Sequence, residues 1–172
     1  ALNAAQLPLP TLVAEQCEPD GSFPTVRFPN PEEAGALDLA IELAKRTDAE
    51  LILANDPDAD RLAVALPDAE GNWHTLHGNT VGCWLAWHMA QRAQAQGLGG
   101  TLACSLVSTP ALARIAAECG LDYAETLTGF KYIAKVENLL FGFEEALGYL
   151  VDPDKVRDKD GISAALAFLD LV

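Results

Sequence analysis

Residues 51–61 read LILANDPDADR, an apolar run that leads straight into a loop of alternating aspartates. The apolar run predicts a short buried strand, and residues 62–66 predict its partner strand after the turn. Alternation within a tight turn can aim the carboxylates of Asp56, Asp58 and Asp60 at one point, where their mutual repulsion favours a bound cation. Carboxylate oxygens suit Mg²⁺ better than zinc, which favours His and Cys. The stretch therefore predicts a strand–turn–strand unit with a magnesium site, and a solvated acidic turn is the alternative.

Arg61 directly follows the last of these aspartates. An arginine at this place can pair with one of the carboxylates or contact an anionic substrate, and the residues alone leave both roles open. An EF-hand does not fit the stretch, because Pro67 occupies the twelfth position counted from Asp56, where that motif has a glutamate.

Outside this unit, strands and helices alternate along the chain. Asn30, Pro31 and Glu33 resemble a helix capping box and predict a helix that ends near residues 45–46. Further strands are predicted at residues 73–76, 101–107, 121–126 and 140–143, with a short extended piece at 12–14, and further helices at residues 79–96, 109–119, 130–136 and 162–172. This alternation predicts an α/β architecture with helices packed on sheet faces. We place a domain boundary at the turn before the second helix, which gives domains 1–76 and 77–172.

Composition limits the classes of partner. The chain has 172 residues, enough for one ordinary domain or two small ones. With 25 acidic against 11 basic residues and a net charge of −14, it would repel nucleic acid and anionic membranes, so we expect neither as a partner. No apolar run reaches the ~20 residues of a membrane helix, and the first residues lack the features of a signal peptide, so we expect a cytoplasmic protein. Because the chain starts without Met and stops inside an apolar helical pattern, we expect a piece excised from a longer protein.

Candidate ligand-binding residues follow the predicted strands of the second half. Residues 128–131 read TGFK and open a helix, where free backbone N–H groups and a cation can hold a phosphate or a sugar hydroxyl. Glu144 and Glu145 end a strand and offer carboxylates to vicinal hydroxyls, although one structural and one solvated glutamate is an equal alternative. Lys159 precedes the last helix and is either a phosphate contact or a surface lysine.

Taken in order, these motifs resemble the α-D-phosphohexomutase superfamily. They are DPDADR at 56–61, TGFK at 128–131, FEEALGY at 143–149 and VRDKDG at 156–161, and FPTVRFPNPEE at 23–33 resembles the segment that precedes the metal loop in this family. The resemblance covers nearly the whole chain. It implies most of the second and nearly all of the third of the family's four domains, each a mixed β-sheet packed with helices.

The resemblance also implies roles for individual residues. Asp56, Asp58 and Asp60 match the Mg²⁺ ligands, and Arg61 and Lys159 match catalytic cations near the phosphoryl group and the substrate. The implied substrate-binding residues are Thr128, Gly129, Lys131, Glu144, Glu145, Ala146 and Arg157. Ala146 departs from the family's common pattern, which has a serine there, and the FEEALGY form is more similar to the branch of phosphopentomutases and related phosphoglucomutases or phosphomannomutases.

The implied activity is intramolecular phosphoryl transfer on a sugar phosphate, between positions 1 and 6 or 1 and 5. A phosphoserine enzyme and a bisphosphorylated intermediate carry the phosphoryl group. The phosphoserine loop and the C-terminal phosphate-binding loop have no counterpart in this chain, so we expect the other mutase domains as partners and no activity from the chain alone. Two alternatives stay open, a phosphatase with Asp56 as nucleophile and Asp58 as acid, and a non-catalytic module that binds divalent ions or sugars.

Overall fold

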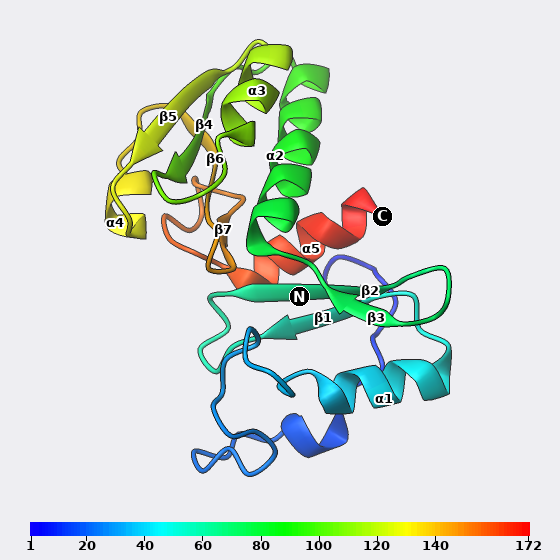
Figure 1. Ribbon diagram of the computed structural model, residues 1–172. Helices are drawn as coiled ribbons and strands as arrows, with labels where there is room; N and C mark the ends of the chain where they lie inside the picture. The colour runs from blue at the N-terminus through cyan, green and yellow to red at the C-terminus, as the bar shows by residue number, and fades with distance from the viewer.

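An antiparallel sheet of three strands carries the aspartate loop. In the computed structural model, which describes residues 1–172, this sheet has the order β1-β2-β3 (Figure 1). Its strands are β1 (Ile52–Asn55), β2 (Leu62–Pro67) and β3 (Trp73–Thr75). Asn55 pairs with Leu62, so the strand–turn–strand unit predicted around the aspartates is confirmed. α1 (Asp38–Thr47) covers one face of this sheet, and α5 (Gly161–Leu171) covers the other (Figure 1).

The second sheet has four strands in the order β5-β4-β6-β7. They are β4 (Thr101–Ser105), β5 (Asp122–Thr126), β6 (Leu139–Glu144) and β7 (Gly148–Leu150). β4 is parallel to both β5 and β6, while β7 returns antiparallel to β6. The carboxyl ends of the three parallel strands therefore share one edge, where an open α/β sheet presents its functional loops.

Helices cover both faces of the second sheet. α2 (Gly78–Ala95) and α3 (Ala111–Glu118) pack on one face, and the single turn of α4 (Phe130–Ile133) packs on the other. The predicted α/β architecture with helices on sheet faces is thus confirmed. No helix combines the length and the apolar character that crossing a bilayer requires.

One hydrophobic cluster joins the two sheets. Its 18 buried residues include Leu62 and Val64 from β2, Phe141 and Phe143 from β6, and Phe168 from α5. α5 packs against β2 of the first sheet and against α2 and β7 of the second half, so the largest buried cluster draws on both halves of the chain. The division into domains 1–76 and 77–172 stays a prediction, because this core draws on residues from both parts.

The predicted start of the first helix is wrong. The helix begins at Asp38, and residues 31–37 form turns and a bend. The side-chain oxygen of Asn30 accepts a hydrogen bond from the backbone N of Glu32 at 3.2 Å, as a helix cap would, but the chain does not continue as a helix. Gly35 then adopts a φ of 83°, outside the helical region.

Smaller predictions also need correction. The extended piece expected at residues 12–14 is absent, and a short 3₁₀-helix, η1 (Ala14–Gln16), begins there instead. The strand expected over 101–107 ends at Ser105, and the helix expected over 130–136 ends at Ile133. β7 was not predicted, because three residues are too few to show a strand period.

The turn between β2 and β3 is held by a half-buried aspartate, Asp68. The carboxylate of Asp68 accepts hydrogen bonds from the backbone N of Asn72 at 2.8 Å and of Glu70 at 3.0 Å, and it lies 2.8 Å from Nε2 of His74. The hydrogen bond with His74, followed by that with Asn72, lowers the pKa of Asp68 to about 2. These contacts stabilise the charged carboxylate and so favour the folded turn.

A carboxyl-detected NMR titration should therefore give Asp68 a midpoint near pH 2. Since the pKa in the folded chain lies below the ordinary value, the charged group stabilises the fold fully above about pH 4, and this contribution falls as the pH drops towards 2. His74→Ala removes the largest cause and should raise the midpoint. A wild-type midpoint near 4 that His74→Ala leaves unchanged would contradict this account of the turn.

Candidate functional site

The predicted metal ligands come together in the loop between β1 and β2. One ligand oxygen of each of Asp56, Asp58 and Asp60 lies within 4.8 Å of the others. The loop closes through a hydrogen bond of 2.9 Å from the backbone N of Ala59 to the carbonyl of Asp56, with Ala59 at a φ of 58°. An all-oxygen donor set that is partly open to solvent fits a hard divalent cation.

Arg61 holds the most buried member of this triad. Its backbone N donates to Oδ1 of Asp56 at 3.1 Å, and its Nε donates to Oδ2 at 2.7 Å. Burial acts to raise the pKa of Asp56, but the hydrogen bonds and charge of Arg61 outweigh it and hold the pKa below its ordinary value. Of the two roles left open for Arg61, pairing with a carboxylate is therefore observed.

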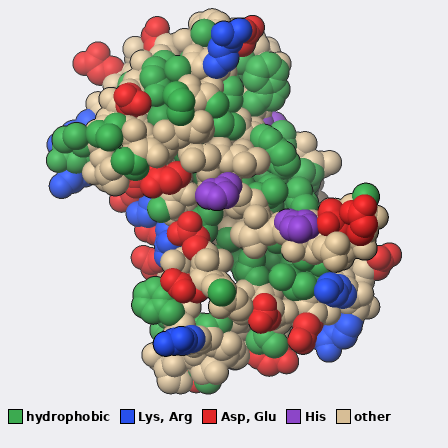
Figure 2. All heavy atoms as spheres, in the orientation of Figure 1, with side chains coloured by type: hydrophobic (Ala, Val, Ile, Leu, Met, Phe, Trp, Pro, Cys, Tyr) green, Lys and Arg blue, Asp and Glu red, His purple; other side chains and the backbone are tan.

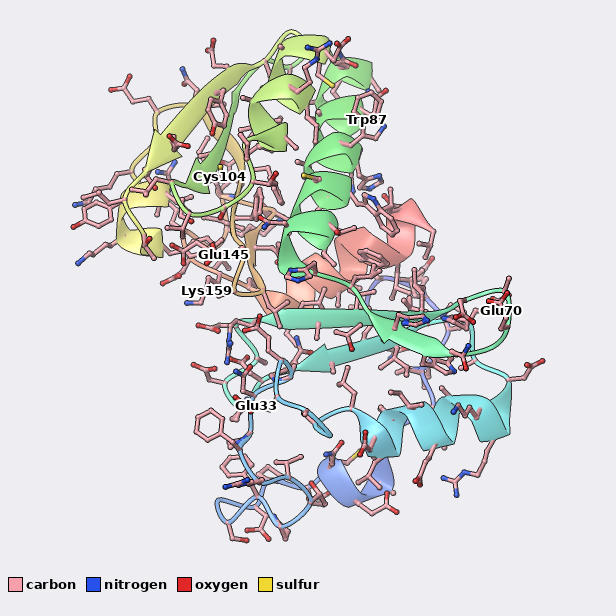
Figure 3. The ribbon with its side chains drawn as sticks, viewed as in Figure 1. Glu33, Glu70, Trp87, Cys104, Glu145 and Lys159 are labelled. Carbon is pink, nitrogen blue, oxygen red and sulfur yellow. The ribbon has the colours of Figure 1, made fainter.

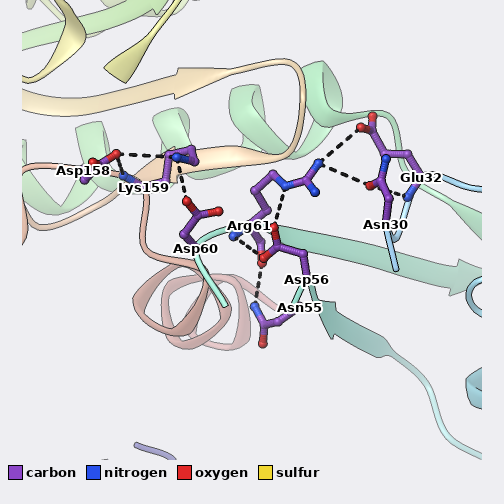
Figure 4. A network of polar contacts seen from close by, with 8 residues as sticks. All are labelled: Asn30, Glu32, Asn55, Asp56, Asp60, Arg61, Asp158 and Lys159. Carbon is purple, nitrogen blue, oxygen red and sulfur yellow. Dashed lines mark hydrogen bonds and ion pairs between the residues drawn. The ribbon is translucent and has the colours of Figure 1, made fainter. Parts of the chain in front are cut away.

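The guanidinium of Arg61 is also held by the chain that precedes α1. Its Nη1 donates to Oδ1 of Asn30 at 3.3 Å and lies 3.7 Å from Oε2 of Glu32 (Figure 4). The sequence suggested only a helix cap for Asn30, and neither residue was predicted to belong to the site. Their place within residues 23–33, the segment whose family resemblance was noted, was the available signal.

Backbone contacts fasten the aspartate loop to the second half of the chain. Arg61 forms an isolated antiparallel bridge with Gly148, and the backbone N of Leu62 donates to the carbonyl of Leu147 at 3.1 Å. Because the bridge lies directly after the triad and directly after residues 144–147, it brings these two loops to one place. Figure 2 shows acidic and basic side chains gathered between the two halves of the molecule.

Lys159 adds an ion pair across the same junction. Its Nζ lies 2.7 Å from Oδ2 of Asp60 (Figure 4). The same atom lies 5.4 Å from the centre of the Phe130 ring. Gly148 makes room for the lysine stem, since a Cβ there would lie 2.6 Å from Cδ of Lys159. Burial acts to lower the pKa of Lys159, but the contact with Asp60 and the charges of nearby carboxylates raise it overall. Lys159 is therefore part of the acidic cluster and not a free surface lysine.

Glu144 lies at the edge of this cluster. The structure places its carboxylate against the backbone N of Gly129, which donates to Oε1. Gly129 has a φ of 119°, a conformation that favours glycine, so the turn that offers this N–H depends on the residue type. Thr128 and Ala146 are exposed beside these two residues. Four of the predicted substrate contacts thus share one surface.

Glu145 does not share the contacts of Glu144. Its carboxylate accepts a hydrogen bond from the hydroxyl of Ser108 and lies 3.3 Å from that of Ser105, at the carboxyl end of β4, and Figure 3 shows it at the end of the second sheet that faces the first. The sequence did not suggest either serine. Polar residues at the carboxyl end of a buried parallel strand were the signal that could have found them.

Lys131 and Arg157 are not drawn into the cluster. Nζ of Lys131 lies over the ring of its neighbour Tyr132, at 5.1 Å from the centroid. Arg157 donates through Nη1 to the carbonyl of Ala134 at 2.9 Å. Neither side chain makes a hydrogen bond or ion pair with the triad or with Glu144, and both are exposed. Their predicted substrate contacts stay predictions.

The first residue of α5, Gly161, packs against the backbone of the aspartate loop. The backbone N of Gly161 donates to the carbonyl of Ala59 at 3.1 Å. A Cβ on Gly161 would lie 2.3 Å from the carbonyl oxygen of Arg61 and 2.8 Å from that of Ala59. Backbone atoms of the aspartate loop cannot shift as the end of a flexible side chain does, so only glycine fits here.

Gly161→Ala should therefore destabilise the chain, although alanine is the better helix former. We expect a loss of about 1–3 kcal/mol in the free energy of unfolding, the usual cost of overpacking, measured by urea denaturation. Gly21→Ala is the matched control, because nothing lies within 4 Å of a Cβ at that position. A Gly161→Ala variant as stable as the wild type would show that α5 and the aspartate loop leave room for a Cβ at this position, and would contradict the close contact.

Comparisons with protein families match the chain in two segments. The model described as phosphoglucomutase/phosphomannomutase, alpha/beta/alpha domain II, matches residues 1–71. The model described as domain III of the same family matches residues 77–172.

Individual relatives agree with this match. The chain is 71% identical over 171 residues to a protein of Haemophilus influenzae named probable phosphomannomutase, covering 99% of this chain and 35% of that protein. It is 45% identical to phosphoribomutase of Saccharomyces cerevisiae, covering 91% of this chain and 28% of that protein. The crystal structure of a phosphoglucomutase/phosphomannomutase family protein from Burkholderia thailandensis shares the fold, with a TM-score of 0.72 at 22% identity, covering 88% of this chain and 32% of that one.

The chain thus spans about a third of the length of these relatives. The family models match nearly all of its residues, and the first relative exceeds two thirds identity over almost the whole chain. On this evidence the chain belongs to the phosphoglucomutase/phosphomannomutase family of α-D-phosphohexomutases, the family that its motifs resemble.

Proposed function

We propose that this chain is the metal-binding and sugar-recognising part of a phosphosugar mutase, whose other domains lie in a longer parent chain. The observation that carries the proposal is the junction at the Arg61–Gly148 bridge. There an acidic triad, two cations and the carboxylate of Glu144 come from distant parts of the sequence to one surface. Catalysis of phosphoryl transfer rests on positioning the substrate and on stabilising the charge of the moving group. A carboxylate that can orient a sugar, beside a cluster of acidic ligands and cations, can supply both.

The triad would hold Mg²⁺ in this proposal. A bound Mg²⁺ would offset the charge that develops on a phosphoryl group in transfer. The oxygens of Asp56 already accept from Arg61, whereas Asp58 is exposed, so Asp58 is the ligand most open to a cation that enters from solvent. Arg61 and Lys159, which ion pairs with Asp56 and Asp60 hold in place, would supply positive charge near the phosphoryl group.

Glu144 would select the sugar. A carboxylate at the end of a strand can accept hydrogen bonds from two vicinal hydroxyls and so orient the ring. Gly129 and Thr128, which adjoin it, stay predictions as substrate contacts, as does Ala146. A hydroxyl-reading surface of this small size suits a substrate that must bind in two orientations, with either end towards the phosphoryl carrier.

The phosphoryl group would move between positions 1 and 6 of a hexose, or 1 and 5 of a pentose, through a bisphosphate intermediate and a phosphoserine outside this chain. The relatives include proteins named for mannose, glucose, ribose and pentose phosphates, which supports a sugar phosphate as the substrate class. We further propose that the mutase acts in the cytoplasm, as the composition of the chain suggests.

The geometry favours this function over the phosphatase alternative. A nucleophilic Asp56 would need a free oxygen directed at the phosphorus. Both of its oxygens instead accept hydrogen bonds from Arg61, and only 5% of its side chain is exposed. The phosphatase hypothesis also gives no role to Lys159 or Glu144, which share the junction.

The test measures mutase activity of the full-length parent with glucose 1-phosphate and ribose 1-phosphate. We expect turnover with Mg²⁺, loss of turnover with a chelator, and none from the 172-residue chain alone. Asp58→Asn and Glu144→Gln should each lower kcat/KM at least ~100-fold, as removal of one stabilising group does in other enzymes.

Asp154→Asn serves as the control for Asp58→Asn, since it removes the same charge from an exposed site outside the triad and should leave turnover unchanged. Turnover by the isolated chain would refute the assignment of the phosphoryl carrier to other domains. Divalent-ion binding without any turnover by the full-length protein would instead favour the non-catalytic module.

A further inference from the structure

Glu145 and two serines form a closed polar network beneath the loop that carries Glu144. Oγ of Ser108 donates to Oε2 of Glu145 at 2.9 Å, and Oγ of Ser105 lies 3.3 Å from the same oxygen. The backbone N of Glu145 donates to Oγ of Ser108 at 3.1 Å, and the two hydroxyls are 2.8 Å apart. Ser105 is fully buried, and Ser108 is 8% exposed.

The hydrogen-bonding capacity of these groups is well matched. A hydroxyl donates one hydrogen bond and accepts two. If Ser108 gives its proton to the Glu145 carboxylate, it accepts from the backbone N of Glu145 and from Ser105. The single proton of Ser105 then serves the shorter contact to Ser108, and its longer contact of 3.3 Å to Glu145 carries no hydrogen bond. Glu145 and Ser108 therefore exchange a pair of hydrogen bonds, one of them to a charged acceptor, the stronger kind.

The backbone around Glu145 is equally constrained. Its carbonyl oxygen packs against the start of α2, where a Cβ on Gly78 would lie only 1.8 Å from it. Leu147 is 2% exposed with a φ of 65°, a left-handed conformation that a leucine keeps only where its surroundings enforce it. Glu145 thus lies between buried partners on both sides, and the residue before it in the sequence is Glu144.

We infer that Glu145 is a positioning residue: through Ser108 and Ser105 it fixes the turn that directs Glu144 at the sugar, and it does not contact the substrate itself. This inference deepens the proposed function and rests on it. It changes the role expected for Glu145 and assigns a role to two serines at the end of β4. A carboxylate whose Oε2 accepts from the hydroxyl of Ser108 could not move to a sugar hydroxyl without giving up that bond.

Steady-state kinetics of the full-length mutase test the inference through double substitutions. Glu145→Gln and Ser108→Ala should each raise KM for the sugar phosphate ~10–100-fold, as expected when a hydrogen bond to a charged group is lost, and should change kcat much less. A KM effect without a matching kcat effect separates loss of sugar orientation from loss of folded enzyme. Ser108→Thr keeps the hydroxyl and should retain most of the wild-type KM.

The decisive comparison adds Glu145→Gln to Glu144→Gln. A residue that acts only through Glu144 has nothing left to position once that carboxylate is gone, so the double variant should match Glu144→Gln alone. If the double variant instead raised KM by the product of the two single effects, Glu145 would contact the sugar directly. That result would overturn the inference and leave the mutase function intact. Glu137→Gln is the control for charge, since that glutamate is exposed away from the network.

The outcomes also separate this inference from the function on which it rests. A wild-type protein without mutase turnover would overturn the proposed function and this inference with it. If Glu145→Gln lowers the yield of folded protein, Ser108→Ala combined with Glu144→Gln gives the same test, because Ser108 contacts Glu145 from the segment after β4 and is not part of the 144–147 loop. Unchanged KM in both Ser108→Ala and Glu145→Gln would equally contradict a positioning role.

Discussion

The backbone contact between the aspartate loop and the second half of the chain is the constraint on which the site depends. Arg61 pairs with Gly148, Leu62 donates to Leu147, and α5 starts so close to the loop that it must begin with glycine. Each contact needs backbone atoms within van der Waals distance, which explains the glycines on both sides of the junction. Without it, the triad and Glu144 would belong to separate surfaces on two sheets that share only an apolar core.

Local charge balance makes this close approach possible. The chain carries a net charge of −14, yet two of its cations lie where the carboxylates converge. Arg61 neutralises Asp56 and Lys159 neutralises Asp60, while the exposed Asp58 keeps its ligand capacity. The arrangement lets three carboxylates approach one another and still leaves the site attractive to a divalent cation. The same two cations belong to separate sequence motifs, so the fold creates a balance that neither motif has alone.

The sequence predicted what local patterns encode. Hydrophobic periodicity and turn residues predicted most strands and helices. The alternating aspartates predicted the triad, because all three carboxylates belong to one short loop. The predicted start of α1 was wrong because the chain leaves the helical region at Gly35, and the contact of Asn30 with Arg61 is a tertiary one that no capping pattern reveals. Glu145 looked equivalent to Glu144 in the sequence, and only the packing of the carboxyl end of β4 distinguishes them.

The central claim is that the triad and the Glu144 loop face one another across this junction. Paramagnetic NMR of the 172-residue chain with Mn²⁺ in place of Mg²⁺ tests it most directly, since bound Mn²⁺ broadens the amide signals nearest to it. We expect strong broadening in the aspartate loop, and strong broadening also in residues 144–148 and 159–161. Strong broadening confined to residues 55–61 would contradict the account.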